Sequence, residues 1–207
     1  DWRPAVLVLV LLTLVVGSVL AELQTDVKRM LAYSSISHAG FILVGLEAAS
    51  HIGHADAHLG MSSAMGYLFI YSILVIGTFA VVSVVAGEGD NATTLDAFKG
   101  LGKKRPVLAL GMTVLLLAQA GVPLTSGFVA KFGIIRAAVS VESYALSVAA
   151  MLAAVIAAFL YLRIMVSMWL SDEESGDDQR EAIKVPLTAG FVVAGSAFFT
   201  LLVGVWP

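Results

Sequence analysis

The stretch at 121–127 reads Gly121-Val122-Pro123-Leu124-Thr125-Ser126-Gly127, and it lies in the middle of a long apolar segment, residues 106–139. A straight helix crosses a bilayer with about 20 residues, so this segment must tilt, bend or break. Proline removes a backbone donor and glycines loosen the hydrogen-bond ladder, which is a known way to build a discontinuous membrane helix. The sequence therefore predicts a break marked by Gly121, Pro123 and Gly127.

Five other apolar segments surround this one, at residues 4–21, 29–47, 62–87, 144–170 and 185–206. The chain of 207 residues is 59% hydrophobic and only 13% charged. Its apolar segments are rich in Leu, Ala, Val and Gly and lack the strict alternation of barrel strands, so helices must satisfy the backbone. We predict an all-α integral membrane protein with six transmembrane helices, the fourth discontinuous, in one transmembrane domain over residues 1–207.

The chain has no cysteine, which excludes disulfides, thiolate metal sites and iron–sulfur ligation by its own residues. The second connection gathers His51, His54, Asp56 and His58, a set that invites comparison with a metal site. Gly53 interrupts the helical spacing, and the residues are expected to be solvated. An ordinary polar loop is favoured, and no metal site is predicted.

Cations gather on one side if the six segments alternate in direction. The first, third and fifth connections hold Lys28, Arg29, Lys99, Lys103, Lys104, Arg105, Arg180 and Lys184. The positive-inside rule then places both ends of the chain outside, with Lys28 as an interfacial anchor on the cytoplasmic side. The start at Asp1 carries no signal-peptide pattern, so the chain is expected to be the later part of a longer protein.

Lys131 is the most prominent candidate for function. It lies eight residues beyond Pro123 in an otherwise apolar stretch, which would place it about 12 Å past the break in a helix. A lysine in hydrocarbon is costly unless it pairs, snorkels, neutralises or lines water, and such groups are functional candidates. The alternative is that Lys131 snorkels to the outer interface beside Arg136.

The second segment is unusually polar. Tyr33 and Ser37 are four residues apart, as are Ser34 and His38, so hydroxyls and an imidazole share adjoining stripes of one helix. Whether His38 relays protons or is a satisfied packing residue stays open on these grounds.

Arg163 lies about eight residues from the acidic loop that follows the fifth segment, and it could snorkel there. No carboxylate inside a span suggests itself as its partner or as that of Lys131. We therefore expect any buried carboxylate partner of either cation to lie on segments missing from this chain or on another subunit.

Several stretches resemble one known family. Residues 26–38 read DVKRMLAYSSISH, residues 98–101 FKGL, residues 118–132 AQAGVPLTSGFVAKF and residues 161–163 YLR. In this order they resemble the antiporter-like subunits of respiratory complex I, whose first signature also occurs in multisubunit cation/proton antiporters. M-type members typically have glutamate where this chain has Lys131, whereas N-type and L-type members have lysine. The run TSGFVAKF at residues 125–132, followed by YLR at residues 161–163, looks more like N-type than L-type members.

The resemblance implies a fold and site roles. Such subunits contain two inverted five-helix repeats, each with a broken helix, and this chain would match the second repeat plus the final helix. Lys131 would match the lysine of the second broken helix, on the proton path. His38 and Lys28 would lie on the hydrated polar axis, supported by Tyr33, Ser34, Ser37 and Arg163.

The resemblance also implies an activity. The chain would be a non-redox, proton-translocating subunit of an NADH:quinone oxidoreductase in a bacterial plasma membrane. FMN, iron–sulfur clusters and quinone would be held by other subunits. Its neighbours would be M-type and K-type subunits, the lateral helix of an L-type subunit and lipid, with no nucleic acid. The rival interpretations are a subunit of a cation/proton antiporter driven by an ion gradient, and a purely structural fragment in which Lys131 is an anchor.

Overall fold

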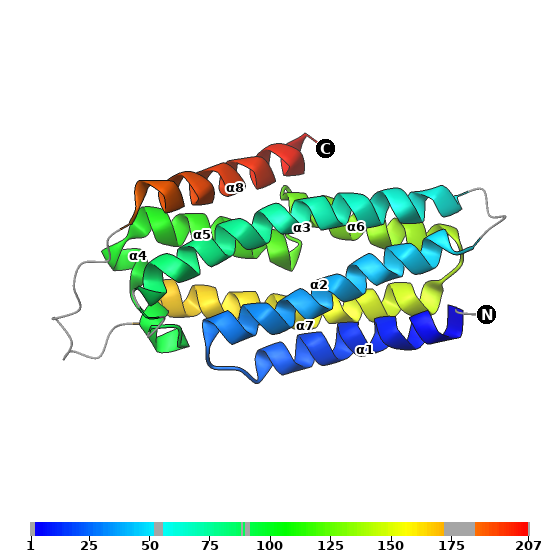
Figure 1. Cartoon of the computed structure of the whole chain (residues 1–207), viewed down its shortest axis with the longest axis horizontal. Coiled ribbons are helices and arrows are strands. Elements are labelled where there is room, and N and C mark those ends of the chain that lie inside the picture. The colour runs from blue at the N-terminus through cyan, green and yellow to red at the C-terminus, as the bar shows by residue number, and fades with distance from the viewer. Residues whose placement is uncertain (1–2, 52–55, 88, 90–91, 172–184, 207) are drawn as a thin grey trace.

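A computed structural model describes residues 3–51, 56–87, 89, 92–171 and 185–206 (Figure 1). His54, Arg180 and Lys184, which entered the metal and orientation arguments, lie outside the described residues, as does the acidic loop at 172–178. Within the described part of the chain every regular element is helical, which confirms the all-α prediction.

Among the described residues, five helices are long and apolar enough to cross a membrane. They are α1 (Arg3–Glu22), α2 (Val27–Ala49), α3 (Ala57–Ala86), α7 (Tyr144–Leu170) and α8 (Leu187–Val205). The predicted fourth segment instead forms two helices of 15 residues each, α5 (Pro106–Ala120) and α6 (Ser126–Ser140). A 3-10 turn, η1 (Leu95–Phe98), and the short helix α4 (Leu101–Lys104) precede α5.

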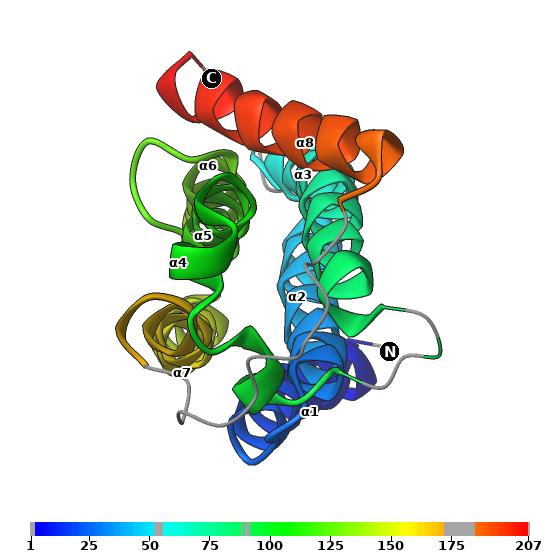
Figure 2. The ribbon, with the colours of Figure 1, turned by 90° about the vertical axis from the view of Figure 1, so that its left-hand side faces the viewer.

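The helices run side by side along one axis (Figure 1). The helices α1, α3 and α7 end and α2, α5 and α8 begin at one end of the bundle, whereas α2 and α6 end and α3 and α7 begin at the other. We call the first the basic end, because it holds the described cations Lys28, Arg29, Lys99, Lys103, Lys104 and Arg105. Viewed from this end in Figure 2, α8 lies across α3 and the α5–α6 pair.

The interior of the bundle is filled by large apolar side chains such as Leu14, Phe41, Leu115 and Leu116. The outer faces of the same helices expose Leu, Val, Ile and Phe in large numbers. A soluble protein would hide these faces, but hydrocarbon is as apolar as they are, so they fit a bilayer solvent.

The basic end is held by backbone pairing between two connections. Val27 N–H donates to Thr93 O at 2.8 Å, and Leu95 N–H donates to Thr25 O at 2.9 Å. Asp26 caps α2 by accepting from Arg29 N–H at 2.9 Å, and Thr93 Oγ1 also donates to its carboxylate. These bonds fix where α2 begins and hence how far its polar residues lie from the basic end.

Candidate functional site

The C-terminal end of α5 is closed by Gly121. Its φ of +89° is in the left-handed region, its N–H donates to Ala118 O at 3.0 Å, and Val122 N–H donates to Leu117 O at 3.1 Å. This is the Schellman pattern that ends many helices at a glycine. Pro123 follows and has no N–H, so it has no donor to offer the carbonyl of Gln119 four residues earlier.

Lys131 supplies the missing donor. Its Nζ donates to Gln119 O at 2.8 Å and to Ala120 O at 3.0 Å, and the side chain is only 6% exposed. A cation at this position also interacts favourably with the partial negative charge of a helix C-terminus. The proline break and the lysine therefore form one structural unit.

The predicted position of the ammonium, about 12 Å beyond the break, is wrong. Lys131 is in the second turn of α6, and helical side chains tilt toward the N-terminus of their own helix. Its stem consequently runs back to the break, whereas Arg136, one turn further on, is exposed. The geometry also contradicts a snorkelling Lys131, because the ammonium points away from the end at which α6 terminates.

The ammonium has uncharged partners. Besides the two carbonyls, Nζ lies 5.2 Å from the centroid of the Phe41 ring, within cation–π range. Among the described residues no carboxylate lies within salt-bridge distance of Lys131. The side chain of Gln119 donates to Thr78 Oγ1 at 2.6 Å, which ties the end of α5 to α3.

Two glycines make this close arrangement possible. A Cβ at Gly127 would lie 1.7 Å from Ala118 O, so the start of α6 passes directly over the backbone of α5. A Cβ at Gly121 would lie 2.9 Å from Lys131 Cδ. The glycines predicted to mark a break therefore also provide the space that the lysine stem needs.

His38 is the centre of a second polar group. Its Nδ1 is 2.7 Å from Tyr67 Oη and its Nε2 is 2.8 Å from Tyr161 Oη. Tyr161 Oη is in turn 2.5 Å from Ser34 Oγ. The Tyr71 ring stacks on the imidazole at a centroid distance of 4.2 Å. Hydroxyls from two helices, α3 and α7, thus occupy both ring nitrogens of a buried histidine of α2.

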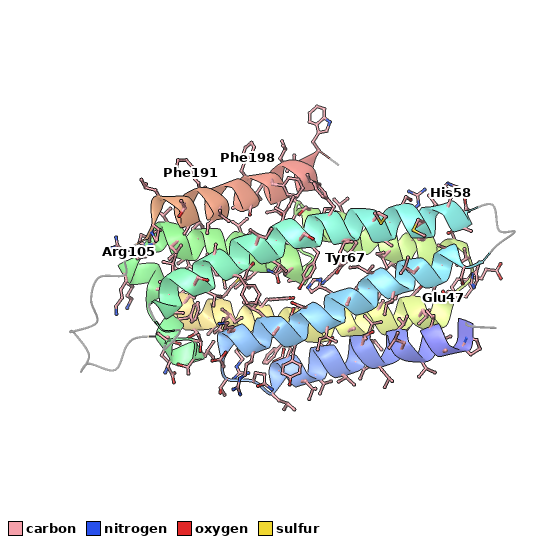
Figure 3. All side chains as sticks on the ribbon, in the orientation of Figure 1. Glu47, His58, Tyr67, Arg105, Phe191 and Phe198 are labelled. Atoms are coloured by element: carbon pink, nitrogen blue, oxygen red, sulfur yellow. The ribbon has the colours of Figure 1, made fainter. Side chains whose placement is uncertain are left out.

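A small cavity of about 10 Å³ separates His38 from Lys131. It is lined by both residues and by Tyr67, Tyr71 and Gly127, among others. About 10 to 15 Å³ is the lower limit for one water molecule. In Figure 3, Tyr67 is near the middle of the bundle, so these polar groups lie deep between the two ends.

The other predicted residues lie elsewhere. Ser37 Oγ pairs with Ser18 Oγ of α1 at 2.9 Å, and Tyr33 is half-buried against the apolar core. Lys28 is exposed at the basic end, in the first turn of α2. The structure therefore brings Ser34, His38 and Lys131 together and leaves Tyr33, Ser37 and Lys28 outside the group.

Arg163 has a partner that the sequence analysis did not find. Its Nη1 donates to Glu22 O, at the last residue of α1, at 2.8 Å. The Glu22 carboxylate also interacts electrostatically with the guanidinium. Glu22 falls one residue beyond the predicted first span, and the bond goes to its backbone carbonyl. The expectation that a buried carboxylate partner of Arg163 lies on segments missing from this chain or on another subunit stays a prediction.

Sequence reasoning also missed four polar residues. Tyr67 and Tyr71 are four apart in an apolar segment, the same spacing that singled out Ser34 and His38, so a signal was available. Tyr161 was noted only as a neighbour of Arg163. Glu47, near the C-terminal end of α2, is buried and accepts from Ser143 Oγ at 3.0 Å.

Of the residues in the second connection that were considered for metal binding, His51 contacts a carboxylate. His51 Nε2 lies 3.2 Å from Glu47 Oε1, one helical turn away. Within the described part of the chain, no three residues of the His, Cys, Asp or Glu types lie close enough to hold a metal. Figure 3 places Glu47 and His58 at the end of the bundle opposite Arg105.

Comparison with known proteins identifies relatives of the whole chain. Residues 1–157 match the family described as NADH:quinone oxidoreductase/Mrp antiporter, TM. A protein named NADH-quinone oxidoreductase subunit N in a Parafrankia species is 45% identical over 207 residues, covering 100% of this chain and 38% of that protein. Subunit N 3 of Streptomyces griseus is 43% identical, and the chain covers 36% of it. The chain thus spans less than half the length of these curated relatives.

A solved structure shares the fold. A chain in respiratory complex I from Thermus thermophilus superimposes with a TM-score of 0.75 at 26% sequence identity. The superposition covers 99% of this chain and 44% of the Thermus chain.

Proposed function

Because the chain belongs to the NADH:quinone oxidoreductase/Mrp antiporter transmembrane family, we propose that it is the C-terminal part of subunit N of an NADH:quinone oxidoreductase. Relatives of that name align with the whole chain at 43% and 45% identity. In this proposal the subunit translocates protons and the redox chemistry takes place elsewhere in a multisubunit membrane complex.

The proposed topology has six crossings. Five are the long helices, and α5 with α6 makes the fourth as one broken crossing, since each has 15 residues and neither reaches the length of about 20 that a span needs. The six would correspond to the second inverted repeat plus the final helix. The basic end would face the cytoplasm of a bacterium, with both ends of the chain outside.

The observation that carries the proposal is the set of partners around Lys131. Two carbonyls and one aromatic ring stabilise its ammonium, whereas a buried carboxylate would hold the charge much more strongly. An amine held by neutral groups can release its proton without leaving an unpaired buried anion behind. Lysine can exchange between ammonium and amine in this way, and a charge arriving nearby would shift the balance.

The polar group around His38 supplies a route to the lysine. A proton would pass along Ser34, Tyr161 and His38 as each hydroxyl or ring nitrogen accepts one proton and donates another. From the other ring nitrogen of His38 the proton would pass to Tyr67, which lines the cavity beside Lys131, and a water molecule there would complete the connection. The proton taken up forms a new N–H bond on Lys131 while one O–H bond of that water breaks, and a new O–H bond on the water forms with the proton that Tyr67 gives up.

The proposal assigns the remaining parts of the reaction to other subunits. FMN, iron–sulfur clusters and quinone would be bound there, since this chain has no cysteine for cluster ligation. M-type and K-type subunits, and the lateral helix of an L-type subunit, are the proposed neighbours.

The test uses the complete subunit in its assembled complex. Lys131→Ala should abolish NADH-driven acidification of inverted membrane vesicles and lower NADH:quinone turnover, with assembly unchanged on a native gel. Arg136→Ala is the matched control, because Arg136 is an exposed cation on the same helix. Normal pumping by the Lys131 variant would contradict the proposal and leave the lysine a structural cap of α5.

The same vesicles discriminate the antiporter alternative, which the family description also covers. Proton movement that is driven by NADH and stopped by loss of quinone turnover supports an oxidoreductase subunit. Proton movement driven by a sodium or potassium gradient in the absence of NADH would support the antiporter instead.

A further inference from the structure

An apolar groove lies between α5 and α8. It has a volume of about 570 Å³, within the range of about 300 to 1,000 Å³ typical of ligand sites. Its walls include Val107 and Val114 from α5 and Gly190, Ala194 and Leu201 from α8. It opens on the outer surface of the bundle, where Phe191 and Phe198 of α8 point outward in Figure 3.

The charge along the groove is concentrated at one end. Lys104 and Arg105, which precede the first residue of α5, line this end, and the other lining residues are apolar or glycine. Figure 3 places Arg105 at the extremity of the bundle, at the basic end. A ligand that fits must therefore combine an anionic group with a long apolar part.

The length of the groove matches one leaflet of a membrane. From Gly190 to Leu201 the α8 wall advances about 16 Å at 1.5 Å per residue. Half of a hydrocarbon core about 30 Å thick is about 15 Å. The apolar part of the groove is thus as deep as the acyl region of a single leaflet, and its cations lie at headgroup level.

We propose that this groove binds one anionic phospholipid. The phosphate would lie against Lys104 and Arg105, and an acyl chain would follow the walls of α5 and α8 as far as Leu201. Basic pockets between transmembrane helices on the cytoplasmic side are typical sites for anionic headgroups. A transmembrane helix from a neighbouring subunit fits less well, because it would need a groove of full membrane depth and has no requirement for cations at one end.

The position of α8 gives the lipid a consequence for the lysine site. Thr200 of α8 accepts from Ser126 N–H at 3.2 Å and pairs with Ser126 Oγ at 2.6 Å. Ser126 is the first residue of α6, the helix that carries Lys131. A lipid between α5 and α8 would hold α8 in place over the start of α6. This consequence rests on the proposed function, whereas the binding site does not.

The test uses the assembled complex in nanodiscs of phosphatidylcholine that contain a small fraction of photoreactive phosphatidylglycerol. Crosslinked peptides are mapped by mass spectrometry. We expect labelling of residues 187–201, reduced at least about tenfold by Lys104→Gln with Arg105→Gln, since each cation near a membrane surface attracts anionic lipid appreciably. Lys103→Gln is the control for net charge, because Lys103 does not line the groove.

A second variant tests the apolar part. Ala197→Leu fills the wall while keeping both cations, and it should reduce the same labelling in a complex whose assembly is confirmed by native gel. Three results would overturn the proposal: equal labelling in all variants, equal labelling by a photoreactive phosphatidylcholine, or a crosslink from the groove to a helix of a neighbouring subunit. Pumping is not the readout, so the lipid site can fail while the proposed function stands.

Discussion

Lys131 and Arg163 are two cations on apolar helices that make the same kind of contact. Each donates to backbone carbonyls at the C-terminal end of another helix, Lys131 to α5 and Arg163 to α1. Helix C-termini carry unpaired carbonyls and partial negative charge, so both contacts follow from one physical cause. The two cations differ in how deeply they are buried and in which groups surround them. Lys131 is buried at a break near Tyr67, and Arg163 is less buried at the end of α1, near the Glu22 carboxylate.

This difference separates a cation that can change its charge from one that cannot. A guanidinium stays protonated in proteins, and a nearby carboxylate reinforces its charge. An amine among neutral partners can lose its proton. Capping a helix therefore does not define the role of a cation, which depends on its residue type and its surroundings.

The variant that tests this distinction most directly is Lys131→Arg, which keeps the positive charge and the capping donors. If proton release is the function, NADH-driven acidification of vesicles should fall at least about tenfold, because proton transfer by a positioned side chain commonly contributes about 100-fold or more. The measurement is the initial rate of acidification relative to NADH:quinone turnover.

Assembly on a native gel controls for steric effects of the larger guanidinium. If the arginine variant pumped at the normal rate, Lys131 would be a fixed charge like Arg163, and the distinction between the two cations would disappear.

The next largest effect should come from Gly127→Ala. The added Cβ would meet Ala118 O at 1.7 Å, so α6 must move away from α5 and carry Lys131 from its carbonyls. We expect several-fold less assembled complex, as a destabilisation of about 1 to 2 kcal/mol commonly produces.

Gly133→Ala on the same helix is the matched control, since its Cβ would lie an ordinary 3.5 Å from Ser63 Oγ. Equal amounts of complex with both variants would show that the crossing of α5 and α6 can relax, and that the lysine does not depend on it.

The break was predictable because Gly121 and Pro123 act locally. A glycine that reverses the chain and a proline without a donor end a helix wherever they occur. The direction of Lys131 was also open to prediction, because the tilt of Cβ is a property of every helix. The predicted position of the ammonium was wrong because it used only the rise along the helix axis and neglected the length of the lysine side chain.

The partners of His38 could not be predicted from local sequence rules. Tyr67 and Tyr161 reach it from helices that begin far along the chain, and only the packing of α3 and α7 against α2 brings them together. Glu22 was missed for a simpler reason. The predicted first span ended at residue 21, and the exact residue at which a helix ends cannot be read from hydropathy.

A smaller effect is expected from Tyr161→Phe, which removes the hydroxyl between His38 and Ser34 without changing the ring. Loss of a hydrogen bond worth about 0.5 to 1.5 kcal/mol should slow pumping by about two- to tenfold. Tyr144→Phe provides the control, because Tyr144 is exposed at the start of the same helix. An identical pumping rate in both variants would remove the His38 group from the route and leave Lys131 to be reached by water alone.

The smallest effect should come from Arg163→Lys. The replacement keeps a positive charge and a donor for Glu22 O, and the contact needs no proton release, so pumping should stay within about twofold of normal. Arg163→Ala should instead reduce the amount of assembled complex several-fold, since it leaves the Glu22 carbonyl without its donor and removes the positive charge near the Glu22 carboxylate. Comparing pumping per assembled complex separates the two effects. A lysine at 163 that assembled normally but pumped poorly would mean that Arg163 acts on the proton path, and then capping at α1 would be as functional as capping at α5.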